Sequence, residues 1–368
     1  LDLHHQPTEQ FYRELNLKEG TLTRSFEVLF DEGKRLQVNA TRFCSMAAPE
    51  LGVIRFAVTP VNFNGKLKLT PYLDFDVRNA DANYGEKFWE PIGLEVSEAD
   101  GWVHSRTRKT GFEVCAAMQY RLTKKGEPVG VTPNLVLEDQ EDYVAHELEV
   151  DLVLGEAVVL EKYAGVTCSR NHDTAHLVEA ARKVAADGHN QGFNTLLKAH
   201  KAVWAQKWEM GDIAIEGDVA AQQGIRYNIF QLHQTYTGDD PLLNIGPKGF
   251  TGEKYGGCTY WDTEAYCLPF YLSTCPPDVA RNLLVYRYKH LEKAIENAAN
   301  LGFSGGAALY PMVTMNGEES HNEWEITFEE IHRNGAIAFA IFNYVRHTDH
   351  SAYLAEYGFE VLVAISRF

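Results

Sequence analysis

The chain has 368 residues, of which 45% are hydrophobic and 23% are charged, as in an ordinary globular protein long enough for two domains. Its 51 acidic and 34 basic side chains give a net charge of −17, which argues against a nucleic-acid partner, because such binding needs cations that neutralise phosphates. No apolar run approaches the ~20 residues that span a bilayer, so no membrane contact is expected. The six cysteines are scattered, without CxxC or metal spacing, so we expect reduced thiols in the cytoplasm and no metal site.

The first 170 residues are patterned as β-strands. Residues such as Lys66–Thr70 alternate as in a half-solvated antiparallel sheet, and turn signals such as Asn64-Gly65 separate the runs. The expected strands are Phe26–Phe30, Arg35–Phe43, Val53–Val61, Leu67–Val77, Val103–Arg106, Gly111–Leu122 and Val144–Val166. This pattern predicts an antiparallel β-sandwich over residues 1–170.

Residues 171–216 change to helical spacing. Two amphipathic helices are expected, at Thr174–Asp187 and Asn194–Met210. A short strand-like stretch around Ile213 and Ile215 follows them. This pair of helices predicts a helical linker between two domains.

Residues 217–368 carry almost only helical signals. One long helix is expected to begin at Pro277, a residue favoured at the first helical turn, and to end at Gly302. Two more are expected at Gly335–His347 and Ser351–Phe368. Helix pairs with long loops between them fit the first part of an (α/α) toroid, with too few helices to close it.

The segment TYWDTE follows a glycine-rich loop and precedes a helical stretch. Trp261 could accept the apolar face of a pyranose, and Asp262 could bridge two of its hydroxyls. The alternative is a buried Trp beside an Asp that caps the following helix. The loop could also present N–H groups to a phosphate, although Lys248 and Lys254 lack the Ser or Thr of a Walker motif.

A second polar stretch, HNEWEITFEEIHRNG, spans His321–Gly335. Its carboxylates are Glu323, Glu325, Glu329 and Glu330. Paired carboxylates can act as acid and base in glycoside hydrolysis. The alternative is a solvated acidic loop whose last two carboxylates cap a helix that begins after Asn334.

Residues Gly224–Tyr344 resemble the maltose phosphorylases of glycoside hydrolase family 65 almost without interruption. The runs that carry the resemblance are GIRYNIFQLHQTY, LNIGPKGFTGEKYGG, TYWDTEAY, ARNLLVYRYKHLEKAIENA, ALYPMVTMNGEE and HNEWEITFEEIHRNGAIAFAI. The N-terminal half is similar more loosely, through ANYGEKFWE and TCSRNHDT. The resemblance implies an N-terminal β-supersandwich over 1–170, a helical linker over 171–216 and part of an (α/α)6 catalytic barrel over 217–368.

The same resemblance implies inverting phosphorolysis of maltose to β-D-glucose 1-phosphate and glucose. It implies no cofactor, inorganic phosphate as a co-substrate, a homodimeric full-length protein and a cytoplasmic location. Trp261 and Asp262 match the pair that holds glucose in the −1 subsite, and ITFEEIHRN matches a loop that shapes the +1 subsite. The expected substrate-binding residues are therefore Trp261, Asp262, Glu329, Glu330, His332, Arg333 and Asn334.

One part of the family's pattern has no counterpart in this sequence. The general-acid Glu of the family stands in a segment like VTGxxEY, which is expected beyond Phe368, as are the phosphate-binding groups. We therefore expect an internal fragment that grips glucose but holds no catalytic residue and is inactive by itself. A phosphorylase of trehalose, kojibiose or nigerose, an inverting α-glucoside hydrolase and an inert sugar-binding fragment are the alternatives.

Overall fold

A computed structural model of the chain describes residues 3, 5–78, 85–138, 142–249, 254–321 and 324–368. These residues fall into two compact units, which meet in sequence between Gln206 and Lys207. We call them the sheet unit and the helical unit and describe each by itself.

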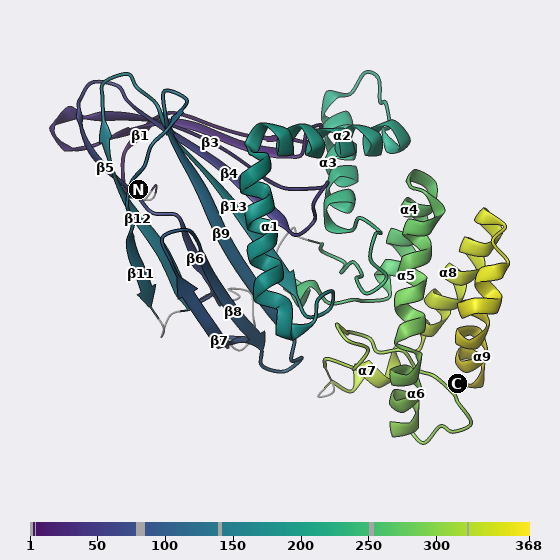
Figure 1. Cartoon of the computed structure of the whole chain (residues 1–368). Helices are drawn as coiled ribbons and strands as arrows, with labels where there is room; N and C mark the ends of the chain where they lie inside the picture. Colours follow the sequence, from purple (N-terminus) through teal and green to yellow (C-terminus); the bar gives the residue numbers. More distant parts are fainter. Residues whose placement is uncertain (1–2, 4, 79–84, 139–141, 250–253, 322–323) are drawn as a thin grey trace. The chain divides into compact units, whose positions relative to one another are not determined.

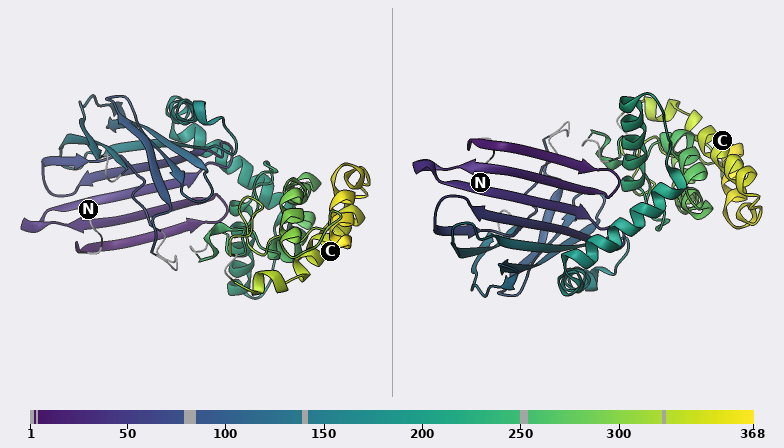
Figure 2. Two further views of the ribbon diagram at one scale, coloured as in Figure 1. Left: turned by 90° about the horizontal axis from the view of Figure 1, so that it is seen from below. Right: turned by 90° about the horizontal axis from the view of Figure 1, so that it is seen from above.

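The sheet unit is built from antiparallel strands. In chain order they are β1 (Thr8–Asn16), β2 (Thr21–Leu29), β3 (Arg35–Cys44), β4 (Leu51–Pro60), β5 (Gly65–Leu69), β6 (Tyr72–Asp74), β7 (Trp89–Val96), β8 (Gly101–Thr107), β9 (Glu113–Lys124), β10 (Glu127–Pro128), β11 (Asn134–Glu138), β12 (Tyr143–Leu152) and β13 (Val158–Cys168). Among the described residues a nine-stranded sheet has the order β1-β2-β3-β4-β13-β9-β8-β7, with β10 beside β9 (Figures 1 and 2). A smaller sheet has the order β11-β12-β5, and β6 also pairs with β12.

The two sheets pack face to face around an aliphatic core. Val38 and Leu160 of the large sheet belong to the same buried cluster as Leu69 and Leu148 of the small one. Alternate residues of each strand supply this cluster, as the period of two requires. The predicted antiparallel sandwich is confirmed.

Helix α1 (Leu177–Gln191) covers the other face of the large sheet (Figure 1). Its small residues Ala181 and Ala185 are buried against β9 and β13. The helix comes so close that a Cβ on Gly165 of β13 would lie 2.3 Å from the carbonyl oxygen of Ala181. The glycine therefore permits this contact between helix and sheet. Helix α2 (Phe193–Gly211) follows, and its Phe193 is buried against the same unit.

The sequence missed strands where their patterns are irregular. Strand β1 is an edge strand with an exposed residue at most positions, so it shows no alternation of apolar and polar residues. Strand β7 contains Pro91 and Gly93, and its register shifts between them. The single strand expected over Val144–Val166 is two, because a turn at Gly155 separates β12 from β13.

The helical unit contains the remaining helices. They are α3 (Val219–Thr235), α4 (Leu268–Thr274), α5 (Pro277–Lys289), α6 (Leu291–Asn300), α7 (Ile326–Glu329), α8 (His332–Thr348) and α9 (Phe359–Arg367). A buried cluster of side chains from these helices, including Leu268, Leu284, Ile337 and Val361, forms its core. The predicted order of an antiparallel sheet domain followed by a helical region is confirmed. The division of the chain at residues 170 and 216 stays a prediction.

Three details of the helical unit differ from expectation. The long helix does begin at Pro277, but it breaks at His290, where no Gly or Pro signals an end. The helix expected from Gly335 begins three residues earlier, at His332. Ile213 lies outside any strand.

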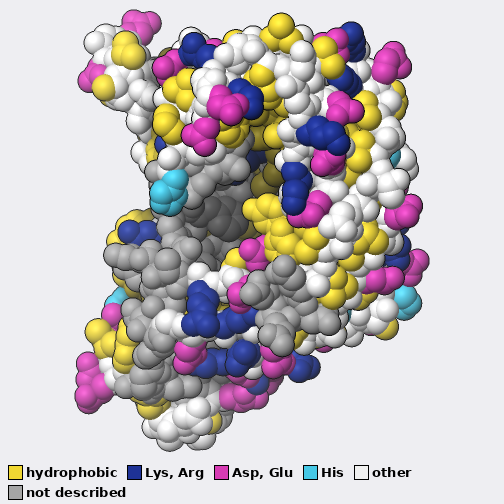
Figure 3. Space-filling view, turned by 90° about the vertical axis from the view of Figure 1, so that its left-hand side faces the viewer, with side chains coloured by type: hydrophobic (Ala, Val, Ile, Leu, Met, Phe, Trp, Pro, Cys, Tyr) yellow, Lys and Arg dark blue, Asp and Glu magenta, His cyan; other side chains and the backbone are white. Residues whose placement is uncertain are grey.

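The surface carries both signs of charge. On the face drawn in Figure 3, basic and acidic side chains are interspersed, so the net negative charge is not concentrated there in one acidic patch. Within the described ranges, no helix is long and apolar enough to cross a membrane.

Candidate functional site

The Trp261-Asp262 pair lies at the start of a π-helical turn, Thr263–Cys267, which continues into α4. Such turns are rare and often occur at functional sites. The segment before the pair is held by a β-bridge in which the Thr259 and Thr314 backbones exchange hydrogen bonds of 2.8 and 3.1 Å. The pair is therefore anchored at both ends.

The Asp262 carboxylate does not cap the helix that follows it. Asp262 has helical backbone angles, φ −55° and ψ −31°, and its side chain makes no capping hydrogen bond. Across the described part of the chain, this carboxylate has no hydrogen-bond or ion-pair partner, and the residue is only partly buried. Of the two interpretations that the sequence left open, the geometry favours an Asp whose oxygens are available to a ligand.

Trp261 is neither fully buried nor alone. Its ring meets His332 edge-to-face at 4.9 Å between centroids, and Tyr266 at 5.7 Å. The fold thus joins the two motifs that the sequence separates, since His332 opens α8 within the second polar stretch. Trp261 and its two neighbours form an aromatic cluster beside Asp262, as carbohydrate sites commonly have.

A buried ion pair holds the segment that carries Trp261 and Asp262. Arg287 of α5 donates from Nε and Nη2 to the two carboxylate oxygens of Glu264, at 2.7 and 2.9 Å. Its Nη2 also donates to the carbonyl oxygen of Tyr260, at 3.1 Å. One guanidinium therefore binds the residue before Trp261 and the residue two after Asp262. We call this arrangement the Arg287 clamp.

The clamp was not predicted from the sequence. Glu264 and Arg287 are 0% and 2% exposed in their side chains, although charged residues are almost never fully buried unless paired. The only sequence signal was a Glu in the same short motif as Asp262. Arg287, which lies between Tyr286 and Tyr288 in the sequence, gave no sign of being the partner of Glu264.

Asn334 is a predicted substrate-binding residue whose amide is already engaged. Its Oδ1 accepts from the backbone N–H of Tyr310 at 3.0 Å, and its Nδ2 donates to the carbonyl oxygen of Ala308 at 2.8 Å. The residue is 5% exposed. Asn334 therefore positions the backbone beside the site through both ends of its amide, and its contact with a ligand stays a prediction.

Arg333 is buried without a partner. It is 1% exposed, and its Nε, Nη1 and Nη2 make no hydrogen bond within the described structure. Burial lowers its pKa to about 10, against the opposing effect of Glu319 and Glu330. A buried guanidinium needs acceptor oxygens, so the Arg333 guanidinium could donate hydrogen bonds to a ligand at the site.

The other predicted residues lie more openly. Glu329 ends α7 and is exposed, and Glu330 follows with its carboxylate 4.0 Å from the Nε2 of His332. The helix they were expected to cap begins at His332 without a side-chain cap. Glu323 lies outside the described residues.

Glu319 is a further polar residue that the sequence did not single out. Its carboxylate accepts from the backbone N–H groups of Met312, Val313 and His321, at 2.6, 3.2 and 3.3 Å. A carboxylate bound in this way fixes the loop between α6 and α7. No group of His, Cys, Asp and Glu in the described ranges has the arrangement of a metal site.

Comparison with known proteins places the chain in a family. Residues 1–207 match the family model described as glycosyl hydrolase family 65, N-terminal domain, and residues 226–368 match the family 65 central catalytic domain. The chain is 44% identical to a maltose phosphorylase of Bacillus subtilis, over 100% of this chain and 47% of that protein. It is 33% identical to an alpha,alpha-trehalose phosphorylase of Thermoanaerobacter brockii, over 97% of this chain and 46% of that protein.

A solved structure agrees with these matches. A putative kojibiose phosphorylase from the human microbiome superimposes with a TM-score of 0.90 at 26% identity, covering 100% of this chain and 47% of that one. The chain thus spans about half the length of the relatives it matches. Since one family model covers more than half of the chain and a second covers most of the rest, the chain belongs to glycosyl hydrolase family 65.

Proposed function

We propose that the protein to which this chain belongs is an inverting glycoside phosphorylase that acts on maltose. Phosphate would attack the anomeric carbon of the non-reducing glucose, while an acid gives its proton to the departing glycosidic oxygen. The products are β-D-glucose 1-phosphate and glucose. In an inverting reaction phosphate takes the place of a hydrolase's activated water, so no separate general base is needed.

The main support for this proposal is the Asp262 carboxylate. It is unpaired and partly exposed, and it lies beside Trp261 on a segment that the Arg287 clamp holds in place. In this role Asp262 bridges two hydroxyls of the glucose that is transferred, and Trp261 packs against its apolar face. Catalysis gains when such contacts tighten as the sugar approaches the transition state. A rigid anchor serves this purpose, because misplacement of a binding group costs rate.

Three nearby carboxylates lie in surroundings that do not suit a general acid. Both oxygens of Glu264 accept hydrogen bonds from Arg287, and the Glu319 carboxylate accepts three backbone N–H groups. Glu329 is exposed at the end of α7. We therefore assign the general acid to none of these three and assign the chain a role in gripping glucose. Arg333, His332 and Glu330 are proposed to line the same site.

The preference for maltose rests on relatedness. The similarity is 44% to a maltose phosphorylase and 33% to a trehalose phosphorylase, and both matches run over nearly the whole chain. Free cysteines at all six positions support a reducing, cytoplasmic compartment. A homodimer is proposed from the family resemblance alone, and light scattering on the purified protein tests it.

The test uses the full-length product of the gene that encodes this chain. It should consume maltose only when phosphate is present, and release β-D-glucose 1-phosphate. Phosphate-independent release of glucose would show a hydrolase instead. Trehalose, kojibiose and nigerose, assayed at equal concentration, decide the substrate, since faster turnover of any of them would refute the maltose assignment.

Asp262→Ala tests the residue itself. We expect kcat/KM to fall by about a thousandfold, because loss of roughly 4 kcal/mol of transition-state binding gives that factor. Asp278→Ala is the matched control, since its side chain is 79% exposed at the start of α5. Near-normal turnover by Asp262→Ala would remove Asp262 from the site.

A further inference from the structure

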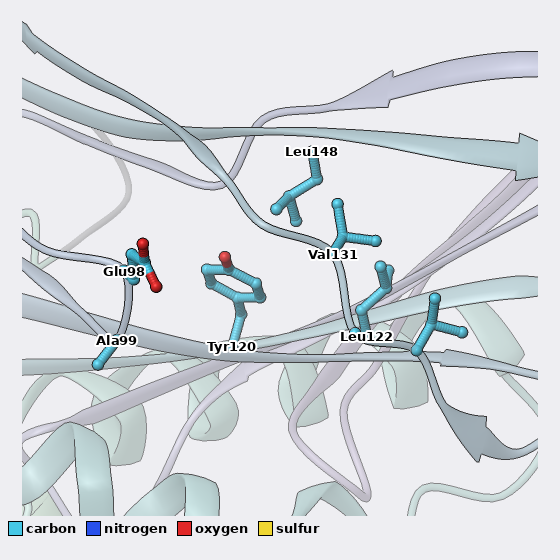
Figure 4. Close-up of a pocket in the computed structure, with 8 residues that line it drawn as sticks. Glu98, Ala99, Tyr120, Leu122, Val131 and Leu148 are labelled. Atoms are coloured by element: carbon cyan, nitrogen blue, oxygen red, sulfur yellow. The ribbon is translucent and has the colours of Figure 1, made fainter.

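The sheet unit contains a pocket of about 280 Å³ between its two sheets (Figure 4). Strand β9 contributes Tyr120 and Leu122, and β12 contributes Leu148. The turn between β7 and β8 contributes Glu98, and the segment after β10 contributes Val131. All of these residues lie in the sheet unit, whereas Trp261 belongs to the helical unit.

The pocket has one polar and one aliphatic end. In Figure 4 the carboxylate of Glu98 and the hydroxyl of Tyr120 lie toward one side, and Leu122, Val131 and Leu148 lie toward the other. Glu98 is exposed and has no hydrogen-bond or ion-pair partner in the described part of the chain. Burial raises the pKa of Tyr120 to about 12, so its hydroxyl stays protonated at neutral pH and can donate a hydrogen bond.

Both polar groups stand on rigid supports. The turn that carries Glu98 is closed by the Ser97 hydroxyl, which donates to Asp100 at 2.8 Å, and Asp100 in turn accepts from Arg182 of α1 at 2.7 Å. The Tyr120 ring packs edge-to-face against His146, with 5.2 Å between centroids. Burial lowers the pKa of His146, which keeps this ring neutral. Little ordering would be needed when a ligand binds.

We propose that this pocket binds a single neutral pyranose of the glucose type, as a second carbohydrate site. The volume lies just below the usual range for small-molecule sites, which suits one sugar ring better than a disaccharide. A pyranose offers an apolar face to the partly exposed Val129 and Val131 side chains, whereas Leu122 and Leu148 are buried in the core, and offers hydroxyls to Glu98 and Tyr120. The Glu98 carboxylate repels anions, so phosphate and sugar phosphates are excluded. The site goes beyond the proposed phosphorolysis and does not depend on it.

The first experiment titrates the methyl-labelled protein with D-glucose and follows methyl resonances by NMR. Leu122, Val131 and Leu148 report on the pocket, whereas Leu268 and Ile337 report on the helical unit. We expect saturable shifts of the pocket methyls with a dissociation constant of roughly 1–10 mM, as weak single-sugar sites have. No saturable shift of these methyls up to about 50 mM, several times the expected constant, would overturn the proposal.

Variants separate the pocket from the Trp261 site. Glu98→Ala, on an exposed turn, should weaken glucose binding about tenfold, because a hydrogen bond to a charged group is lost. Tyr120→Phe should weaken it by a smaller factor and keep the ring in place. Glu127→Ala is the matched control, an exposed carboxylate on β10 outside the pocket, and should leave binding unchanged.

Two further outcomes decide the matter. In Asp262→Ala the pocket methyls should respond to glucose as before, even if phosphorolysis is lost, so the two proposals can fail separately. Sorbitol carries similar hydroxyls on an open chain without the flat apolar face, and should shift the pocket methyls at least about tenfold more weakly. Equal responses to sorbitol and glucose, or binding unaffected by Glu98→Ala, would refute a pyranose site.

Discussion

The two units of this chain handle charge differently. In the sheet unit, Arg55 and Glu161 form a close ion pair in which Arg55 remains 32% exposed. In the helical unit, Arg287 and Glu264 pair with side chains only 2% and 0% exposed. Among the ion pairs of the described residues, no other has both partners so deeply buried.

This difference indicates what the buried pair is for. Surface ion pairs contribute about 0–1 kcal/mol, and a buried pair often stabilises no more than the apolar residues that could replace it. Stability therefore does not explain a clamp beneath Trp261 and Asp262. Its geometry does, because it fixes the backbone on both sides of the two residues proposed to grip glucose.

The largest effect is expected from Arg287→Ala. The substitution leaves Glu264 charged, buried and unpaired, and should destabilise the helical unit by about 3–5 kcal/mol. Hydrogen exchange should rise in α4 and α5 and stay unchanged in the strands of the sheet unit. The double variant Arg287→Met with Glu264→Leu removes both charges and should recover most of the stability but little of the activity. Recovery of full activity by this variant would contradict the positioning role.

Gly165→Ala should instead destabilise the sheet unit and leave the helical unit unchanged. Its new Cβ would overlap the carbonyl oxygen of Ala181, so α1 must shift away from the large sheet. We expect a loss of about 3 kcal/mol, at the upper end of the usual range for overpacking. Exchange should rise in α1, β9 and β13 only. Gly52→Ala on β4 is the matched control, since its nearest neighbour would be 3.9 Å away. Equal losses in the two variants would show that the close contact is not the cause.

A pH dependence of intermediate size is expected from His233 of α3. Burial, with a smaller effect of Lys207, lowers its pKa to about 4 in the folded chain, against about 6.5 when unfolded. Between these values the unfolded state binds a proton that the folded state does not, so stability falls as the pH is lowered from about 6.5 toward about 4. The loss at pH 5 should be about 2 kcal/mol.

Urea unfolding at pH 7 and pH 5, read by hydrogen exchange in α3 and α4, measures this loss. His233→Leu should remove that part of the pH dependence, whatever its effect at pH 7. An unchanged slope in the variant would assign the acid sensitivity to another group.

The smallest effect is expected from Lys66→Ala in the sheet unit. Lys66 pairs with Glu149 across strands β5 and β12, but both side chains are about two-thirds exposed, at 66% and 65%. Solvent screens such a pair, so the unfolding midpoint in urea should not change measurably. A shift comparable to that of Arg287→Ala would erase the contrast between the two units.

Regular patterns made much of the fold predictable. Alternation over Lys66–Thr70 and the run Arg35–Phe43 predicted strands, and Pro277 marked the first turn of α5. Prediction failed at the edges, in β1 and at the bulge of β7, because strands paired on one side need no strict alternation. It also failed at His290, where no residue that disfavours helix is present.

The substrate-binding residues of the candidate site stay a prediction. The sequence identified Trp261, Asp262 and His332 as residue types suited to sugar, and the resemblance to a family assigned them a role. Asn334 holds the backbone at Tyr310 and Ala308 through both ends of its amide, and no motif indicates these contacts. The role of a polar side chain therefore depends on which hydrogen-bond partners the fold places beside it.

By itself, then, the sequence determined the class of most segments and the chemistry of its motifs, since periodicity and residue type are local properties of the chain. Only the tertiary structure decided that Trp261 meets His332, that Arg287 binds Glu264, and that Glu98 and Tyr120 share a pocket. These contacts join residues far apart in the chain, and no local pattern encodes such pairings.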